Sequence, residues 1–540
     1  MPDAHDHSTA WWRQAVVYQV YVRSFADADG DGTGDIDGLR SRLDHLVDLG
    51  VDAIWLNPWY RSPMRDGGYD VADYRDIDPR FGSLASAEAL IRDAQSRGIR
   101  VIVDLVPNHT SDQHRWFQEA IAAPPGHPAR GRYIIRPGRG RDGVEPPTDW
   151  QAVFGGPAWH RLADGEWYLH LFDISQPDLN WEHPEVRAEF IDVLRFWLDR
   201  GVDGFRVDVA HGMVKDPTFP DIGERALLLS TPMFDDHPHW DRDEVHDIVR
   251  EWRAVLDEYG AMMVAEAWVR PSRLARYLRP GEFHQSFNFS LLDAPWDPER
   301  FRAVIERSVA AAVEVGATST WVVSNHDVVR HATRYALPAG AEWRDLYTAP
   351  PPADLDLARG LRRARAVALL TLSLPGSAYI YQGEELGLHE VLDLPEEVLD
   401  DPTWERSGHT DRGRDGCRVP LPWARSGPSC GFGAGPAWLP QPSWFAECSA
   451  EAQRDDPGSV LHLYRRALRI RRELLRADET FEMLDLGPGV VAYRRSDGFV
   501  CAVNMGARTV PRPPGEVVLS SGELDGDELP VDTAVWVRMS

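Results

Sequence analysis

Short apolar runs alternate with segments of helical periodicity along most of the chain. Eight runs have the length and composition of buried strands, namely residues 16–25, 51–58, 100–107, 204–210, 262–268, 286–291, 320–324 and 378–382. Between them, residues 36–49 repeat leucine on one face and stop at Gly50, and residues 185–199 carry a similar apolar face. Apolar positions three and four residues apart predict helices. Eight strands alternating with helices predict an α/β fold, the (β/α)8 TIM barrel.

Two stretches interrupt this alternation. Between His109 and Gln176, proline, glycine, arginine and tryptophan dominate and no helix–strand unit is evident, so we expect residues 110–176 to form a domain inserted after the third strand. Residues 383–453 follow the eighth strand and become rich in proline and tryptophan. Long irregular segments on a rigid scaffold often carry function, so we expect a long loop region over the barrel mouth.

The chain changes character near its C-terminus. Residues 489–495 and 499–504 are short strand-like runs separated by the turn sequence Ser-Asp-Gly. Short strands joined by tight turns are typical of antiparallel sheets. We therefore expect a C-terminal β-sandwich over residues 476–540, with the barrel formed by residues 1–109 and 177–475.

Three acidic residues follow three of the predicted strands. Asp208 ends Gly-Phe-Arg-Val-Asp, Glu266 lies in Val-Ala-Glu-Ala-Trp, and Asp327 ends Ser-Asn-His-Asp. Residues at the C-terminal ends of barrel strands meet at one mouth. Hydrolysis of a glycosidic bond needs one carboxylate to attack or stabilise an oxocarbenium-like carbon and one carboxylic acid to protonate the leaving oxygen. A third carboxylate would raise the pKa of that acid by like-charge repulsion and could bind sugar hydroxyls.

A single acid at a strand end is more often the partner of a structural salt bridge, but the neighbouring residues argue against that interpretation here. Arg206 precedes Asp208 by two positions, so both side chains of an extended strand point to one face, where the cation would keep the carboxylate ionised. His326 adjoins Asp327, and His109 ends another apolar run. Acids, an arginine and two histidines at four strand ends indicate a catalytic site.

Composition and charge narrow the possible ligands. The 540 residues, with 43% hydrophobic residues and 21 tryptophans, can bury a large core and still offer surfaces on which sugars stack. The net charge of −27 disfavours nucleic acid and anionic membranes and suits a neutral small oligosaccharide. Lys215 is the only lysine and lies in no glycine-rich phosphate loop, which excludes a Walker-type nucleotide site and argues against Schiff-base chemistry.

Neither a membrane segment nor a disulfide framework is predicted. Residues 1–10 are polar and acidic, and no apolar run reaches the roughly 18 residues that a membrane helix needs. The four cysteines are too few and too irregularly spaced for a disulfide scaffold or a zinc site, so we interpret them as free thiols. We therefore expect a cytoplasmic protein, and the sequence leaves its oligomeric state open.

On these motifs the chain resembles the α-amylase family of glycoside hydrolases, and within it the oligo-1,6-glucosidase and α-glucosidase group. The resemblance covers almost the whole chain. It rests on Tyr-Gln-Val-Tyr at 18–21, Asp-Leu-Val-Pro-Asn-His at 104–109, Gly-Phe-Arg-Val-Asp at 204–208, Asn-His-Asp at 325–327, Gln-Pro-Asp-Leu-Asn-Trp at 176–181, and Glu266. The hexapeptide at 176–181 is similar to that group's own signature near the end of the inserted domain.

The resemblance implies a role for each acid. Asp208 would be the nucleophile that forms a covalent β-glucosyl intermediate, and Glu266 the general acid and then the general base. Asp327 would stabilise the transition state by gripping the 2- and 3-hydroxyls. Net retention of the α-anomer would follow. A retaining mechanism places the two reacting carboxyls roughly 5 to 5.5 Å apart.

The resemblance also implies the walls of the innermost sugar pocket. Arg206, His109 and His326 match positions that contact the nucleophile or the glucose hydroxyls. Tyr69 would stack under the glucose ring, and Asp66 would bind its far hydroxyls. Further candidates for stacking at the mouth are Phe154, Trp159, Phe172, Trp268 and Phe289.

Arg414 resembles the arginine that pairs with Asp66 and closes the pocket behind the non-reducing end of the sugar. Such an ion pair would make the enzyme exo-acting, because a longer chain could not thread through the pocket. Arg418 competes with Arg414 for this role, and a surface salt bridge is the alternative for both pairs.

An acidic loop near the N-terminus has the spacing of a calcium site. Asp27, Asp29, Asp31 and Asp35 occupy positions 1, 3, 5 and 9, and Thr33 would offer its carbonyl at position 7. The closing glutamate of such loops is missing. An Asp/Gly turn that caps the next helix is the alternative. The resemblance favours a structural calcium ion remote from the chemistry, and no organic cofactor is expected.

Bond preference depends on few residues. In similar enzymes the residue after the nucleophile helps to sort linkages, valine with α-1,6 and threonine with α-1,4 activity, and this chain has Val209. Its continuation Ala-His-Gly-Met is nevertheless more similar to maltose-preferring bacterial α-glucosidases. We therefore expect an α-glucosidase for short substrates with α-1,4 activity favoured over strict α-1,6. The alternatives are a transglucosylase or isomerase with the same covalent intermediate and, in another class, a non-catalytic transporter-associated or sugar-binding protein.

Overall fold

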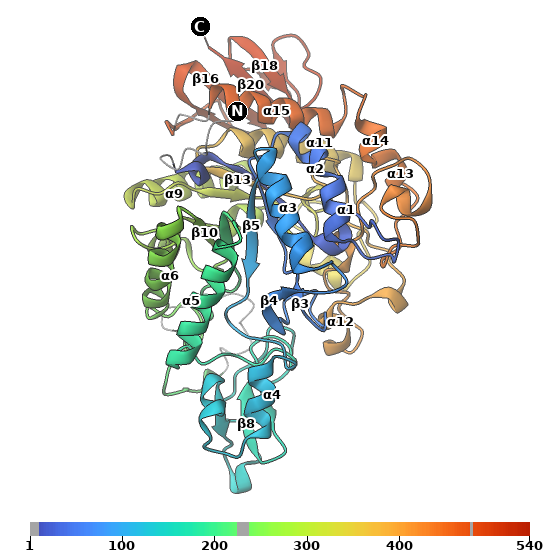
Figure 1. Cartoon of the computed structure of the whole chain (residues 1–540). Helices are drawn as coiled ribbons and strands as arrows, with labels where there is room; N and C mark the ends of the chain where they lie inside the picture. The colour runs from blue at the N-terminus through green and yellow to red at the C-terminus, as the bar shows by residue number, and fades with distance from the viewer. Residues whose placement is uncertain (1–9, 224–236, 476–478, 540) are drawn as a thin grey trace.

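The structure is a computed structural model that describes residues 10–223, 237–475 and 479–539. The polar residues 1–9 and the boundary expected at residue 476 lie outside the described residues. Figure 1 shows three parts along the long axis: an inserted segment at one end, the barrel in the middle and a C-terminal sheet at the other end. In the described ranges no helix is long and apolar enough to span a bilayer.

Eight parallel strands form the central sheet. They are β1 (Val16–Val20), β2 (Ala53–Leu56), β5 (Arg100–Leu105), β9 (Gly204–Val207), β10 (Met262–Ala265), β11 (Gln285–Ser286), β12 (Thr320–Val322) and β13 (Ser377–Tyr381). Their order is β11-β10-β9-β5-β2-β1-β13-β12, and a parallel bridge between Phe287 and Thr320 joins the two edges. The sheet therefore closes, and the predicted barrel is confirmed.

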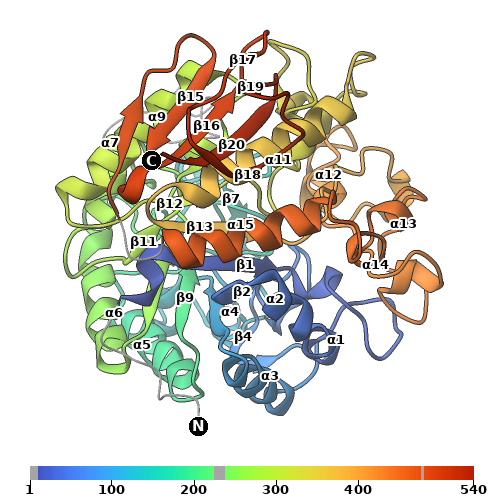
Figure 2. The ribbon, with the colours of Figure 1, turned by 90° about the horizontal axis from the view of Figure 1, so that it is seen from above.

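Helices surround the barrel, as the view from above shows (Figure 2). The longer ones are α3 (Leu84–Ser96), α5 (Pro184–Leu198), α6 (Val245–Tyr259), α9 (Pro298–Glu314), α11 (Leu357–Ser373) and α15 (Val460–Leu474). The single helix predicted over residues 36–49 is two helices, α1 (Ile36–Ser41) and α2 (Leu43–Leu49), because Arg42 leaves helical geometry at φ −112° and ψ 7°.

The sixth strand is shorter than the apolar pattern predicts. Strand β11 ends at Ser286, and the helix α8 (Phe289–Leu292) begins within the run predicted as strand. The side chain of Asn288 accepts a hydrogen bond from the backbone N–H of Leu291 and caps this helix. The cap turns the chain out of the barrel wall and carries Phe289 to the mouth.

The inserted segment has regular structure that was not evident in the sequence pattern. Helix α4 (Arg115–Ala122) packs beside a small antiparallel sheet in the order β6 (Ile135–Pro137), β8 (Glu166–Leu169), β7 (Trp159–Arg161). Strands of three or four residues are too short to show a period in the sequence. This unit lies at the end of the barrel toward which β5 points (Figure 1). Its apolar cluster includes Val209 of the loop after β9, so the insertion braces that loop.

The region after β13 contains only short helices, α12 (Pro402–Arg406), α13 (Phe445–Cys448) and α14 (Ala450–Gln453), joined by irregular chain. It folds back over the first βα loop, where the backbone N–H of Asp27 donates to the carbonyl of Phe432 at 2.8 Å. The part that carries Arg414 and Arg418 reaches Asp327 at the barrel mouth.

A five-stranded antiparallel sheet forms the C-terminal unit, in the order β14 (Glu482–Leu484), β15 (Val490–Arg494), β16 (Phe499–Asn504), β20 (Thr533–Arg538), β18 (Glu516–Ser520). One face packs on α11, where the indole N–H of Trp536 donates to the Leu369 carbonyl at 3.0 Å. The ribbon of β17 (Val510–Pro511) and β19 (Glu528–Leu529) packs through Leu529 on the other face and supplies the second layer of the predicted sandwich.

Candidate active site

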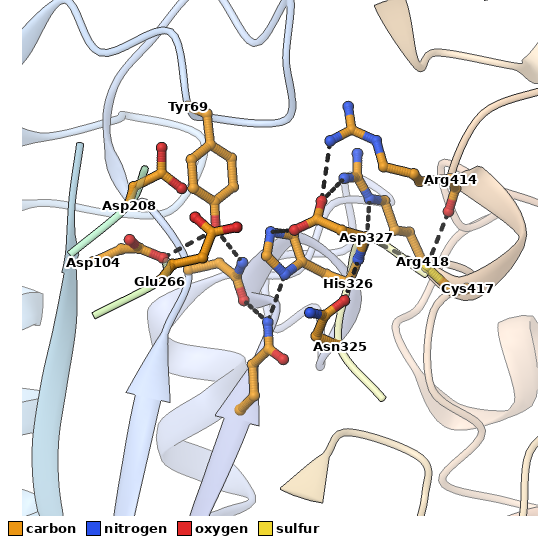
Figure 3. A network of polar contacts seen from close by, with 12 residues as sticks. Tyr69, Asp104, Asp208, Glu266, Asn325, His326, Asp327, Arg414, Cys417 and Arg418 are labelled. Atoms are coloured by element: carbon orange, nitrogen blue, oxygen red, sulfur yellow. Dashed lines mark hydrogen bonds and ion pairs between the residues drawn. The ribbon is translucent and has the colours of Figure 1, made fainter. Parts of the chain in front are cut away.

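Strand ends converge at the barrel mouth, and Arg206 of β9 lies among them. Its Nη1 is 2.9 Å from Asp104 Oδ1 near the end of β5 and 2.6 Å from Asp208 Oδ1 just beyond β9. Its Nη2 is 2.9 Å from Glu266 Oε2 just beyond β10. The Arg206 residue as a whole is 1% exposed. The structure therefore brings together Arg206, Asp208 and Glu266, and it adds Asp104; Figure 3 shows how the three acids face one another.

Burial governs the ionisation of these acids. It raises the pKa of Asp104 to about 7, although Arg206 opposes the shift. It also raises the pKa of Asp208 well above its ordinary value; Arg206 again opposes the shift, and Glu266 and Asp104 add like charge. One cation cannot balance three carboxylates, so the cluster holds a proton near neutral pH. The side chain of Glu266 also interacts directly with the Asp208 carboxyl, which contributes to the raised pKa of Asp208.

Glu266 is oriented by donors on both carboxyl oxygens. The indole N–H of Trp268 donates to Oε1 at 3.1 Å, and the backbone N–H of Val209 donates to Oε2 at 3.0 Å. Val209 has φ +44°, a conformation that is rare for a β-branched side chain and costs strain. The strained turn directly after Asp208 is what aims this N–H at Glu266.

Asp327 has the opposite electrostatic surroundings. Its Oδ1 lies 3.0 Å from Arg414 Nη1 and 3.1 Å from Arg418 Nη2, and its Oδ2 lies 3.2 Å from His326 Nε2 (Figure 3). Burial opposes ionisation, but His326 and the two guanidinium groups hold the pKa of Asp327 well below its usual range. Asp327 is therefore an ionised carboxylate, unlike Asp104 and Asp208, whose pKa values are raised.

His326 and Tyr69 form a stacked wall, with ring centroids 5.2 Å apart and planes 12° apart. The amide of Gln19 lies 2.8 Å from His326 Nδ1 and donates to it, which assigns the ring proton to Nε2. Burial lowers the pKa of His326 well below its ordinary value, so the ring is neutral. The Tyr69 hydroxyl donates to Asp104 at 3.0 Å and ties this wall to the cluster around Arg206.

Asp66 lies between Arg414 and Gln176 and contacts both. Arg414 Nη2 lies 2.8 Å from Asp66 Oδ1, whereas Arg418 contacts Asp327 and the His326 carbonyl instead. The amide of Gln176 donates to Asp66 Oδ2 at 2.9 Å and lies 3.1 Å from His109 Nε2. Of the two competing arginines, Arg414 is the one that contacts Asp66.

Some of the aromatic candidates lie beside polar residues of the site, and one lies in a hydrophobic core. Phe172 lies against His109, with ring centroids 5.2 Å apart, and Phe154 lies 5.2 Å from the Arg414 guanidinium carbon. Trp159 is 3% exposed inside the inserted unit, so it belongs to a core. The rings of Trp268 and Phe289 stack face to face at 4.0 Å.

A cleft of about 830 Å³ adjoins this last pair. Trp268 and Phe289 line it together with Asp293, Arg334 and Trp343. The indole N–H of Trp268 also contacts the Glu266 carboxyl, so Trp268 connects that acid with the cleft, although Glu266 does not line the cleft itself. A space of this size admits a group larger than one side chain.

Three polar residues of the pocket were missed in the sequence, and each had a local signal. Asp104 interrupts the apolar run 100–107, and Gln19 lies inside β1, whose residues are all buried. Gln176 opens the hexapeptide at 176–181. A polar side chain inside a fully buried strand needs a partner. Here Asp104 pairs with Arg206, and Gln19 pairs with His326.

The acidic N-terminal loop gathers three of its predicted ligands. Carboxylate oxygens of Asp27, Asp29 and Asp35 lie within 4.8 Å of one another. Asp31 is not in this group, and its carboxylate accepts from the backbone N–H of Thr33 at 2.7 Å. Asp35 also caps α1 by accepting from Gly38 N at 2.7 Å, which is the alternative function considered for this loop. Three clustered carboxylates are the hard oxygen donors that Ca²⁺ prefers, so the loop fits that ion.

The pocket as a whole suits attack at a sugar carbon. Asp208 and the Glu266 carboxyl lie together on the Arg206 guanidinium, and the ionised Asp327 can stabilise positive charge that develops nearby. Neutral His326 offers an N–H toward the same space. Such a set is what cleavage of a glycosidic bond requires.

Comparisons with known proteins agree with this chemistry. The family model described as alpha amylase, catalytic domain, matches residues 19–478. A probable alpha-glucosidase of Rhizobium meliloti (strain 1021) is 38% identical over 520 residues, covering 92% of this chain and 89% of the relative. The oligo-1,6-glucosidase of Parageobacillus thermoglucosidasius is 34% identical over 97% of this chain and 96% of its own length. The crystal structure of the alpha-glucosyl transfer enzyme XgtA is similar with a TM-score of 0.84 at 35% identity, covering 98% of this chain and 100% of that chain.

Proposed function

The chain belongs to the alpha-amylase family, and we propose that it is a retaining, exo-acting α-glucosidase that releases α-glucose from the non-reducing end of short α-glucosides. Maltose-type α-1,4 bonds are its proposed main substrates, and α-1,6 bonds are secondary. The observation that carries this proposal is the pair of carboxyls, Asp208 and Glu266, bound to separate nitrogens of one buried arginine.

Each acid has surroundings that suit its proposed step. Arg206 stabilises the Asp208 carboxylate as nucleophile and would hold the same oxygen as it becomes part of the glucosyl ester. Glu266 would protonate the departing oxygen and then remove a proton from water, keeping its orientation through Val209 and Trp268. Asp327 would bind the hydroxyls next to the reacting carbon. Two displacements at that carbon return the α configuration.

The proposed exo action rests on the contact between Arg414 and Asp66. Both side chains are largely buried, at 15% and 5% exposed, and they lie 2.8 Å apart. An ion pair across one end of the pocket leaves room for a terminal glucose and none for a chain that continues past it. The walls offered by His109, Gln176 and Phe172 complete that closed end.

A transglucosylase is the second candidate, and the cleft beside Glu266 is the observation that favours it. The leaving sugar would depart toward Trp268 and Phe289, and the same cleft could hold an acceptor hydroxyl in place of water. The solved structure described as an alpha-glucosyl transfer enzyme has the same fold over its whole length. A non-catalytic role, by contrast, would not require the buried set of three acids around Arg206.

We also propose that the loop of Asp27, Asp29 and Asp35 binds a structural Ca²⁺. Bound there, the ion would supply no step of the reaction and would fix the start of α1. The cytoplasm is the proposed location, since the four cysteines are free thiols, as is usual in a reducing compartment.

Replacing the nucleophile should stop turnover without unfolding the protein. Asp208→Asn keeps the shape of the side chain but removes the attacking charge, so kcat on p-nitrophenyl α-glucoside should fall by at least about 10³-fold. Asp216→Asn in the same loop is the matched control, because that carboxylate pairs with Arg242 outside the pocket, and it should retain activity. Substantial hydrolysis by the Asp208 variant would contradict the nucleophile assignment.

Replacing the acid should have an effect that depends on the leaving group. Glu266→Gln cannot protonate the departing oxygen, so turnover of maltose should fall by about 10²-fold or more. Fluoride leaves α-glucosyl fluoride without protonation, so the rate of the first step with this substrate should fall much less. Burst amplitudes with both substrates measure this step. An equal loss on both would count against the acid role.

Calcium should raise thermal stability through the acidic loop. At a Ca²⁺ concentration about 100 times its Kd, mass action predicts a rise in Tm of about 2 °C for a chain of this size, reversed by a chelator. Asp29→Asn should abolish the rise. Asp37→Asn, which removes an exposed acid of α1 outside the cluster, should keep it. A rise that persists in Asp29→Asn would place the ion elsewhere.

A further inference from the structure

Arg414 is held by a third carboxylate that is outside the sugar pocket. Asp401 immediately precedes α12, and its side chain is 0% exposed. Its Oδ2 accepts from Arg414 Nε at 2.5 Å and from the Arg414 backbone N–H at 3.1 Å. Its Oδ1 accepts from Thr403 N at 2.8 Å and caps α12. Both oxygens of Asp401 are therefore committed, one to the helix and one to the arginine.

The surrounding backbone is built around this contact. The Asp415 carboxylate accepts from the backbone N–H groups of Asp400 and Asp401, at 2.6 and 3.0 Å. Gly413 has φ +62°, and a Cβ there would lie 2.5 Å from the Asp401 side-chain carbon Cγ. The chain can pass this close to Asp401 only with glycine at position 413. Because of this approach, both the backbone N–H and the side chain of Arg414 contact the Asp401 carboxylate.

The three carboxylates around Arg414 differ in what a sugar would do to them. Asp66 and Asp327 face the pocket and are the groups proposed to bind glucose hydroxyls, so they must share their oxygens when substrate enters. Asp401 lies behind the guanidinium and has no such competitor. A sugar in the pocket would therefore not compete for the oxygen with which Asp401 binds Arg414.

We propose that Asp401 is a positioning residue that fixes the Arg414 guanidinium at the closed end of the pocket before substrate binds, and so sets the preference for short substrates. This inference rests on the proposed α-glucosidase function. Preorganised groups improve binding because the cost of ordering them is met in folding. Burial opposes ionisation of Asp401, but Arg414 and Arg418 lower its pKa to about 2, so the anion is present at any working pH.

A role confined to capping α12 is the competing explanation. Asp401→Asn separates the two, because the asparagine carbonyl can still accept from Thr403 N while its NH₂ group meets the N–H groups of Arg414 with no charge to offer. The matched control is Asp400→Asn. The Asp400 carboxylate, which neighbours Asp401 in the sequence, is 47% exposed and pairs with Arg23 on the surface.

The test is steady-state kinetics on p-nitrophenyl α-glucoside, maltose and maltotetraose, with Tm recorded for every variant. Loss of a charge-assisted hydrogen bond should raise KM for maltose roughly 10- to 100-fold in Asp401→Asn. The change in kcat should be smaller, and selectivity for maltose over maltotetraose should narrow. Asp400→Asn should match the wild type within about 2-fold, since an exposed ion pair contributes little.

Coupling to Arg414 decides between positioning and a general structural effect. If Asp401 acts through Arg414, the double variant Arg414→Ala/Asp401→Asn should have the KM of Arg414→Ala within about 2-fold. Arg414→Lys keeps the charge but cannot bridge three carboxylates, so it should raise KM as Asp401→Asn does. If Asp401→Asn folds poorly, Arg414→Lys takes its place in the test.

Additive effects in the double variant, or an unchanged KM in Asp401→Asn with an active wild type, would overturn the inference and leave the proposed function intact. A wild type without activity on any α-glucoside would overturn the proposed function and this inference with it.

Discussion

The buried guanidinium of Arg206 is the interaction on which the site depends. Three carboxyls, Asp104, Asp208 and Glu266, meet at one barrel mouth with almost no access to water, and removing charges from water is costly unless they are paired. One cation bound by all three makes the arrangement stable, yet it leaves the negative charge incompletely balanced. Burial together with this imbalance raises the pKa of Asp104 to about 7 and the pKa of Asp208 well above its ordinary value.

The barrel explains how such an arrangement is held. Adjacent parallel strands β5, β9 and β10 bring Asp104, Arg206 and Glu266 within contact because their register is fixed by the sheet. The loop regions then finish the pocket. The segment after β13 contributes Arg414, and the inserted unit contributes Phe154 and Phe172. The rigid sheet thus sets the reacting groups, and the loops set which sugars fit.

The fold and the reacting acids could be predicted from the sequence because both have local signals. Apolar runs mark all eight strands, and the acids follow them directly. The small sheet β6-β8-β7 could not be predicted, because its strands are shorter than any period. The break between α1 and α2 depends on the backbone geometry of the single residue Arg42. The early end of β11 is followed by a helix that depends on the single cap made by Asn288. Asp401 was also missed, because its importance depends on a contact with Arg414. The spacing of the two residues in the sequence does not predict that contact.

The most direct test of the account is proton NMR of the purified protein acting on maltotetraose, followed within the first minutes, before released glucose mutarotates. A retaining exo-glucosidase with a closed pocket should first convert maltotetraose to glucose and maltotriose in equal amounts, and the α-anomeric signal of the released glucose should precede its β signal. Early β-glucose would contradict the double displacement at Asp208. Formation of maltose directly from maltotetraose, before maltotriose accumulates, would contradict the pocket closed by Arg414 and Asp66.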